Sequence, residues 1–125
     1  MTPLLVDTHV LLWWRGDSDR ISARAREAIE NPDVPLFFSA ASIWEIAIKR
    51  AQGKLSVPEN LLDTMEERGF LELPVVSRHA VRAGALPAHH GDPFDRMIVA
   101  QAQTEGLTVV TSDARIAAYD VPVLW

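Results

Sequence analysis

The stretch of residues 91–113, GDPFDRMIVAQAQTEGLTVVTSD, joins a well-marked helix to a well-marked strand. Asp92 followed by Pro93 predicts a helix start, because an Asp side chain accepts hydrogen bonds from the first free backbone N–H groups and Pro has no N–H to lose. Gly106 predicts that the helix ends in a left-handed conformation. Residues 107–110 are a short, continuous apolar run, which is typical of a strand buried on both faces. The pair therefore predicts a parallel sheet covered by helices.

The same alternation of strand and helix runs along the rest of the chain. Four more apolar runs predict strands at residues 4–6, 36–38, 71–76 and 121–124, and Pro74 in the third favours an edge position or an early end. Polar caps, apolar residues at helical spacing, and Pro or Gly stops predict helices at residues 22–31, 39–52, 58–68, 77–84 and 114–119. We therefore expect an α/β fold, with three layers in the order α/β/α and a central, mainly parallel sheet.

Length and composition limit the other possibilities. A chain of 125 residues with 48% hydrophobic content is long enough for one core and too short for two, so we expect a single domain over residues 1–125. The absence of cysteine excludes disulfides, thiolate zinc sites and thiol nucleophiles. The sequence has no signal-peptide pattern and no apolar run near the ~20 residues of a membrane span, so we expect a cytoplasmic protein. The net charge of −5 argues only weakly against nucleic-acid binding, since acids gathered around metal ions also lower the net charge.

Four acids stand at positions that a parallel sheet would bring together. Asp7 and Asp113 follow predicted strands, Asp95 lies in a first helical turn, and Glu45 lies in the most apolar part of a helix. Each has another explanation, such as a helix cap for Asp7 or a favourable helix-dipole position for Glu45. Because strand ends share one edge of the sheet, the four carboxylates can also converge on one pocket. Clustered carboxylates repel one another unless cations compensate, and all-oxygen ligands favour Mg²⁺ or Mn²⁺.

Other polar residues near these acids have two interpretations each. Thr111 and Ser112 could orient a ligand or an attacking water, or they could simply form a turn or cap. Asp92 is an extra acid that either caps its helix or contacts a metal ligand without binding the metal itself. The adjacent His89 and His90 have poor spacing for one metal, so we expect exposed loop residues with a smaller chance of a substrate contact. His79 is expected on a helix surface, and His9 at most as a support for a ligand.

Four segments, LLVDTH, SIWEIAIK, DPFDRMIVAQA and VVTSD, occur in this order between residues 4 and 113. Together they resemble the PIN-domain ribonucleases, and closely the VapC toxins of bacterial and archaeal toxin–antitoxin pairs. The resemblance extends over residues 4–125, and it matches Asp7, Glu45, Asp95 and Asp113 to the acidic metal-binding quartet of that family. It implies an endoribonuclease that depends on Mg²⁺ or Mn²⁺, in which a metal-activated water attacks phosphorus and the 3′ oxygen leaves.

The resemblance also implies partners. Family members are typically homodimers that are inhibited by a VapB-type antitoxin, whose C-terminal segment lies across a groove near the active site. Trp13, Trp14 and Trp44 could line such a groove or the dimer contact, with core packing as the alternative for at least one of them. The residues that could contact the RNA substrate are basic, although some could form an ordinary solvated face; they are Arg15, Lys49, Arg50, Lys54 and Arg96.

We also considered whether the same residues fit three other functions. A phosphatase of the haloacid-dehalogenase type would need an acid two residues after the first strand-end Asp, where this chain has His9. A receiver-type phosphorelay domain would need an acid pair and a late-strand Lys, which we do not find. A PIN-like module that binds RNA or protein without cleaving it is the remaining alternative, and the intact acidic quartet argues against it.

Overall fold

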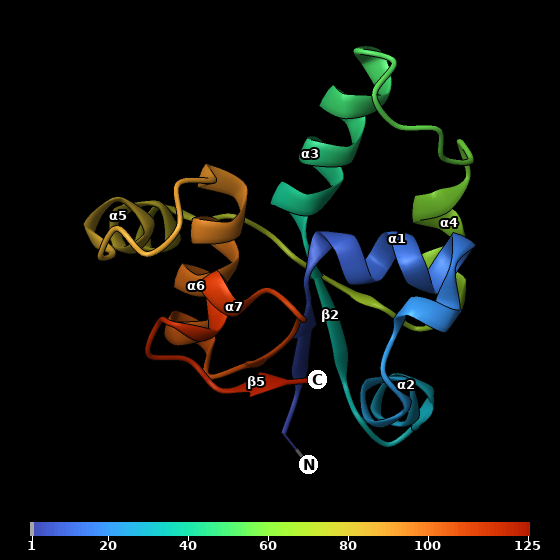
Figure 1. Cartoon of the computed structure of the whole chain (residues 1–125), viewed down its shortest axis with the longest axis horizontal. Coiled ribbons are helices and arrows are strands. Elements are labelled where there is room, and N and C mark those ends of the chain that lie inside the picture. Colours follow the sequence, from blue (N-terminus) through green and yellow to red (C-terminus); the bar gives the residue numbers. More distant parts are fainter. Residues whose placement is uncertain (1) are drawn as a thin grey trace.

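A parallel five-stranded sheet forms the centre of the molecule over residues 2–125, the part of the chain that this computed structural model describes (Figure 1). The strand order is β3-β2-β1-β4-β5 and every pairing is parallel. The strands are β1 (Leu4–Val6), β2 (Leu36–Ser39), β3 (Leu71–Leu73), β4 (Thr108–Val110) and β5 (Val123–Leu124). The predicted α/β class with a parallel sheet is confirmed.

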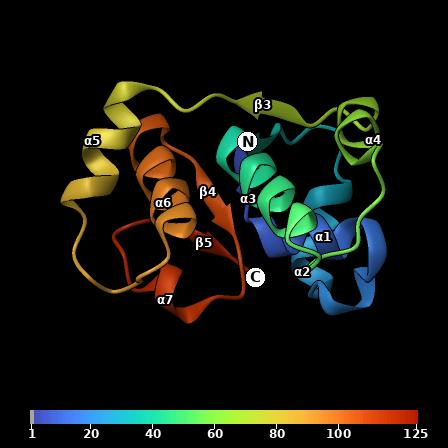
Figure 2. The ribbon, with the colours of Figure 1, turned by 90° about the horizontal axis from the view of Figure 1, so that it is seen from above.

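Helices cover both faces of this sheet, which confirms the three-layer arrangement. The helices are α1 (Thr8–Gly16), α2 (Ala23–Glu30), α3 (Ala40–Ala51), α4 (Leu61–Glu67), α5 (Ser77–Ala85), α6 (Pro93–Glu105) and α7 (Ala114–Ala117), with a short 3-10 turn at Ser18–Arg20. Figure 2 shows α1, α2 and α4 on one side of the molecule and α5, α6 and α7 on the other. None of the helices within residues 2–125 is both long enough and apolar enough to cross a bilayer.

The alternation of side chains along β1 divides the core into two clusters. Leu4 and Val6 point to one face and pack with Val10, Phe38 and Met65. Leu5 points to the other face, where the core is built from residues of α6, β4 and α7, including Ile98, Val99, Val109 and Ile116. Because β1 is the middle strand of the five, the residue after it lies at the centre of the carboxyl edge of the sheet.

The residues that were predicted to begin and end the helix in the stretch 91–113 have these roles in the structure. The Asp92 side chain accepts hydrogen bonds from the backbone N–H groups of Phe94 (2.8 Å) and Asp95 (3.2 Å), and Pro93 is the first residue of α6. Gly106 ends the helix with φ +70°, in the left-handed region that a residue with a Cβ adopts at a cost. The caps therefore fix where α6 begins, and with it the position of Asp95.

Several element boundaries differ from the prediction. Strand β3 ends at Leu73, one residue before Pro74, and it lies at the edge of the sheet, as proline's missing N–H favours. Helix α4 begins at Leu61, because residues 58–60 form a turn in which the Leu61 N–H donates to the Pro58 carbonyl. Ser77 is the first residue of α5 and not its cap.

His79 was predicted on a helix surface, and this prediction is wrong, because its side chain is 1% exposed. Its Nδ1 accepts a hydrogen bond from the Val76 N–H (3.1 Å), which closes the first turn of α5. Its Nε2 lies 2.7 Å from Oε2 of Glu105 on α6. The packing of α5 against α6 therefore buries a histidine that single-helix periodicity would leave in solvent.

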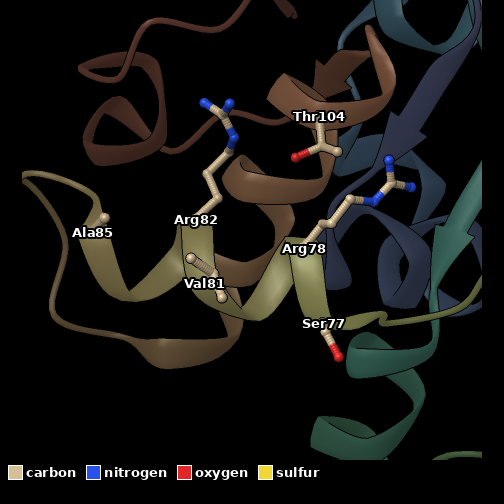
Figure 3. Close-up of a pocket in the computed structure, with 6 residues that line it drawn as sticks. All are labelled: Ser77, Arg78, Val81, Arg82, Ala85 and Thr104. Carbon is tan, nitrogen blue, oxygen red and sulfur yellow. The ribbon is translucent and has the colours of Figure 1, made fainter.

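A hollow lies between α5 and α6 (Figure 3), lined by Ser77, Arg78, Val81, Arg82, Ala85 and Thr104. Thr104 follows Asp95 by nine residues on the same helix, which corresponds to about 13 Å along the helix axis. The hollow is therefore separate from the acids at the start of α6.

Candidate active site

Strands β1 and β4 place two of the predicted acids side by side. Val6 pairs with Val110 in the sheet, so Asp7 and Thr111 follow the two strands in register. The Asp7 N–H donates to the Val110 carbonyl (3.1 Å), and the Asp7 side chain accepts from the Val10 N–H (3.1 Å) as the cap of α1. The predicted cap function of Asp7 is thus present together with its position at the sheet edge.

Thr111 and Asp113 form a tight turn after β4. The Thr111 hydroxyl accepts from the Asp113 N–H (3.0 Å) and makes a side-chain hydrogen bond to Asp7. Asp113 caps α7 by accepting from the Arg115 N–H (2.8 Å). Ser112 is exposed. Thr111 therefore orients Asp7 and the backbone of Asp113, whereas Ser112 faces solvent.

Helices α3 and α6 bring the other two predicted acids to the same edge. Glu45 is 2% exposed and Asp95 5% exposed. A buried hydrogen bond from Thr8 Oγ1 to Ser42 Oγ (2.8 Å) joins the first turns of α1 and α3, one helical turn before Glu45. Sequence reasoning did not find this link, because it joins two hydroxyls 34 positions apart in the chain.

The pKa values show how close the carboxylates are. Burial, the neighbouring carboxylate of Asp92 and, to a smaller extent, the charges of Asp7 and Glu45 together raise the pKa of Asp95 to about 6, against a lowering effect of His90. Burial also raises the pKa of Asp7, although the hydrogen bonds from Thr111 and Val10 oppose this. For Asp113, burial raises the pKa, but the Arg115 N–H, His90 and the Arg115 side chain together lower it below the ordinary value. Ligand atoms of Asp113 and Asp95 lie within 4.8 Å of each other, and Asp7 and Glu45 act on the pKa of Asp95, so the structure brings all four predicted acids together.

Glu45 shows that this cluster is suited to a cation. Its Oε2 accepts from Lys49 Nζ (2.7 Å), and this hydrogen bond raises the pKa of Lys49. Its Oε1 is buried without a hydrogen-bond partner. A buried charged oxygen without a partner is costly, and several oxygens of this type are the donor set that Mg²⁺ and Mn²⁺ prefer. The residues present therefore fit a divalent metal ion.

His90 was predicted to be an exposed loop residue, and this prediction is wrong. Its side chain is 3% exposed, and Nε2 lies 3.0 Å from Asp95 Oδ2 and 3.1 Å from Asp113 Oδ2. Its Nδ1 accepts from the Asp92 N–H (3.1 Å). The loop before α6 has no periodicity from which burial could be read, and the position of His90 two residues before the cap Asp92 is the only local signal. His89 is exposed, as predicted.

Arg96, which was grouped with the possible RNA-contacting residues, makes hydrogen bonds within the protein. Its guanidinium donates to the Ala83 (2.8 Å), Leu86 (3.0 Å) and Pro87 (2.9 Å) carbonyls and to the Tyr119 hydroxyl (3.3 Å). Both terminal nitrogens are thus occupied by the protein. Arg96 ties the loop that carries His90 to α6.

Replacing Arg96 with Ala should lower the free energy of unfolding by about 2–3 kcal/mol, because several hydrogen bonds from a charged donor to backbone carbonyls are lost. Urea unfolding followed by circular dichroism measures this. The matched control is Arg24→Ala on the exposed face of α2, which should change stability little. Equal stability of both variants would contradict this structural assignment.

The other predicted basic residues remain near the surface. Lys49 is paired with Glu45 at the acid cluster, and Arg50 pairs with the exposed Glu59 (3.1 Å). Arg15 and Lys54 are exposed. Of these basic residues, Lys49 has an ion pair with a member of the acid cluster.

The three tryptophans differ in their surroundings. Trp14 packs against Phe70 with ring centroids 5.0 Å apart, which confirms core packing for at least one of them. Trp13 is partly buried and contacts the Trp125 ring. Trp44 is 65% exposed and meets the edge of Phe94 at 5.3 Å. Trp44 and Phe94 directly precede Glu45 and Asp95, so this aromatic pair borders the acid cluster.

The chain is similar to known proteins along nearly its whole length. Residues 4–122 match the PIN domain family model. Ribonuclease VapC22 of Mycobacterium tuberculosis (strain ATCC 25618 / H37Rv) is 33% identical over 125 residues, which covers 98% of this chain and 95% of that protein. The crystal structure of DNA-bound VapBC from Salmonella typhimurium matches with a TM-score of 0.72 at 21% identity, covering 99% of this chain and 98% of that chain. VapBC-5 from Mycobacterium tuberculosis matches with a TM-score of 0.64 at 20% identity, with coverage of 99% and 98%. At these identities the two solved structures bear on the fold alone.

Proposed function

Since this chain belongs to the PIN-domain family, we propose that it is a metal-dependent endoribonuclease and the toxin of a toxin–antitoxin pair, which hydrolyses phosphodiester bonds of RNA. The similarity to a VapC ribonuclease supports this reaction class. The single observation that carries the proposal is the convergence of four carboxylates, three of them buried, with one buried oxygen of Glu45 left without a partner. Such a cluster costs stability unless it binds a cation, so its presence favours a metal-using enzyme over a module that only binds.

In this proposal Asp7, Glu45, Asp95 and Asp113 hold Mg²⁺ or Mn²⁺. The bound metal supplies Lewis acidity, which activates a water and stabilises the charge on the leaving oxygen. Asp92 holds the first turn of α6, and therefore Asp95, in place through its two N–H contacts. The hydrogen bond of Thr111 orients the Asp7 carboxylate and opposes the rise that burial causes in its pKa. Both are positioning residues.

The RNA backbone would be held by the basic residues that the protein leaves accessible. These are Arg15, Lys49, Arg50 and Lys54, whereas Arg96 is occupied. Lys49 is the one paired with Glu45, so a phosphate at the acid cluster would lie within reach of its ammonium group. Charge neutralisation of phosphates makes RNA affinity fall with rising salt.

Incubation of total cellular RNA with purified, partner-free protein tests the proposal. We expect discrete fragments with 5′-phosphates in Mg²⁺ or Mn²⁺, no cleavage in EDTA, and recovery when metal is added back. Circular dichroism in EDTA checks that the protein stays folded. Equal cleavage in EDTA would refute the metal-dependent mechanism, and no cleavage by folded protein in either metal would favour the inactive binding module.

We also propose a VapB-type antitoxin partner and a homodimer. The similar solved structures are VapBC complexes, which supports the first. Co-expression with the neighbouring reading frame followed by co-purification tests the antitoxin, and light scattering of the isolated protein tests the dimer.

A further inference from the structure

We infer that His90 is a positioning residue of the metal site: it donates its Nε2–H to the carboxylate of Asp113, beside that of Asp95, and does not bind the metal itself. The inference rests on the proposed function, because it concerns the residues that would hold the metal. Three side chains, His90, Asp95 and Asp113, have ligand-type atoms within 4.8 Å of one another. Such a group could be interpreted as a three-residue metal site with a histidine ligand, so the two roles of His90 must be separated.

The backbone next to His90 decides between them. The Asp92 N–H points at Nδ1 of His90 over 3.1 Å, so Nδ1 is the acceptor nitrogen of the ring. An imidazole nitrogen that accepts a hydrogen bond carries no proton, which leaves the ring proton on Nε2. Nε2 is then a donor, and it faces carboxylate oxygens at 3.0 and 3.1 Å.

Metal binding through Nε2 would require the opposite tautomer. The ring proton would move to Nδ1, where it would meet the Asp92 N–H head to head. That N–H would lose its acceptor in a part of the molecule where His90 is 4% exposed, and a buried donor without a partner is costly. The start of α6 therefore selects the donor form of His90.

The ring is also held from other sides. The His90 backbone N–H donates to the Tyr119 hydroxyl (2.9 Å), and that hydroxyl donates to the Pro87 carbonyl (2.7 Å). Tyr119 thus fixes the backbone of the residue whose ring faces the carboxylates. Each carboxylate oxygen has two lone pairs, so an oxygen that accepts from His90 can still bind a metal.

His79 offers an internal control for this chemistry. Its Nδ1 accepts from the Val76 N–H (3.1 Å) and its Nε2 lies 2.7 Å from Glu105 Oε2. His79 therefore makes the same two kinds of contact as His90, but its partner Glu105 lies at the opposite end of α6 from Asp95. Loss of the His79 hydrogen bond should therefore affect stability without affecting metal binding.

The first experiment is ¹⁵N NMR of the histidine rings in the full chain, without metal and with saturating Mg²⁺. We expect the Nε2–H tautomer of His90 in both states. A shift to the Nδ1–H tautomer when Mg²⁺ binds would overturn the inference, because it would identify Nε2 as a ligand.

The second experiment measures Mg²⁺ and Mn²⁺ affinity by calorimetry for the wild type, His90→Gln, His90→Leu and His79→Gln. Gln can place an N–H where Nε2–H lies, so His90→Gln should bind both metals almost as well as the wild type. His90→Leu should weaken both by a similar factor of about 10–100, as is typical when a partner of a metal ligand is removed. His79→Gln should bind as the wild type does.

The outcomes separate the inference from the function on which it rests. Wild-type affinity in His90→Leu would refute the positioning role, and an equal loss in Gln and Leu that is larger for Mn²⁺ than for Mg²⁺ would show a histidine ligand. If folded wild type bound neither metal, the proposed function would fail and the inference with it. If His90→Leu does not fold, the inference is tested by the metal affinity of His90→Gln and by the tautomer of His90 in the wild type. A large loss of affinity in His90→Gln or the Nδ1–H tautomer with Mg²⁺ would then refute it.

Discussion

Replacement of Asp7 by Asn should lower the rate of RNA cleavage by about 10³-fold or more while the protein stays folded. Lewis-acid stabilisation by a bound metal contributes several kcal/mol, and each 1.4 kcal/mol corresponds to a factor of ten in rate. Asn keeps the shape of the side chain and is an equally good helix cap, so the hydrogen bond to the Val10 N–H can persist. Single-turnover cleavage of a defined RNA measures the effect.

The control is the same chemical change away from the cluster. Asp63 lies exposed on α4, and Asp63→Asn should cleave as fast as the wild type. Because burial raises the pKa of Asp7, its charge costs folding energy, and Asp7→Asn should be no less stable than the wild type. A folded Asp7→Asn variant with wild-type cleavage would refute the assignment of Asp7 to the metal site.

Replacement of Asp95 by Asn should abolish cleavage and stabilise the metal-free protein at pH 7. Burial and the carboxylate of Asp92, followed by those of Asp7 and Glu45, raise the pKa of Asp95 to about 6, whereas an unfolded Asp has a pKa of about 4. An acid with a raised pKa in the folded state binds its proton more tightly there. Its ionisation therefore costs no stability below about pH 4, an increasing amount up to about pH 6, and a constant amount above that.

The size of the effect follows from the same shift. Asn carries no charge, so the variant should be more stable than the wild type by about 1–2 kcal/mol at pH 7, after a reduction for partial solvent screening. Urea unfolding in EDTA from pH 4 to pH 8 measures both proteins, and their stabilities should converge towards pH 4. Added Mg²⁺ should stabilise the wild type and have little effect on Asp95→Asn. A variant less stable than the wild type at pH 7 would contradict the electrostatic account.

The sequence predicts the parts of this site that depend on local rules. Asp7 and Asp113 follow apolar runs, and the alternation of strands and helices alone places such residues at one sheet edge. Asp95 follows from the cap Asp92 and Pro93, whose geometry the structure confirms. Glu45 is the hardest of the four, because its burial depends on how α3 packs beside α6, and its apolar neighbours in the helix were the sequence signal that singled it out.

The residues that the sequence misplaces lie where tertiary contacts decide. The contacts of His90 and Arg96 arise where the end of α5 and the loop of residues 86–92 pack against α6 and Tyr119. Hydrophobic periodicity within one element does not predict such contacts. His79 is buried only because α5 packs against α6. In all three cases the side chain is polar and satisfies its hydrogen bonds with distant groups, so hydrophobic patterning gives no signal.

The hydrogen bond from the Thr111 N–H to the Leu124 carbonyl (3.3 Å) extends the pairing of β5 with β4 to the residue that orients Asp7. The central strand β1 therefore carries a carboxylate whose partner Thr111 is held in turn by the edge strand β5. A change that detaches β5 from β4 should therefore loosen Thr111 and disturb the orientation of Asp7, although no residue of β5 belongs to the acid cluster.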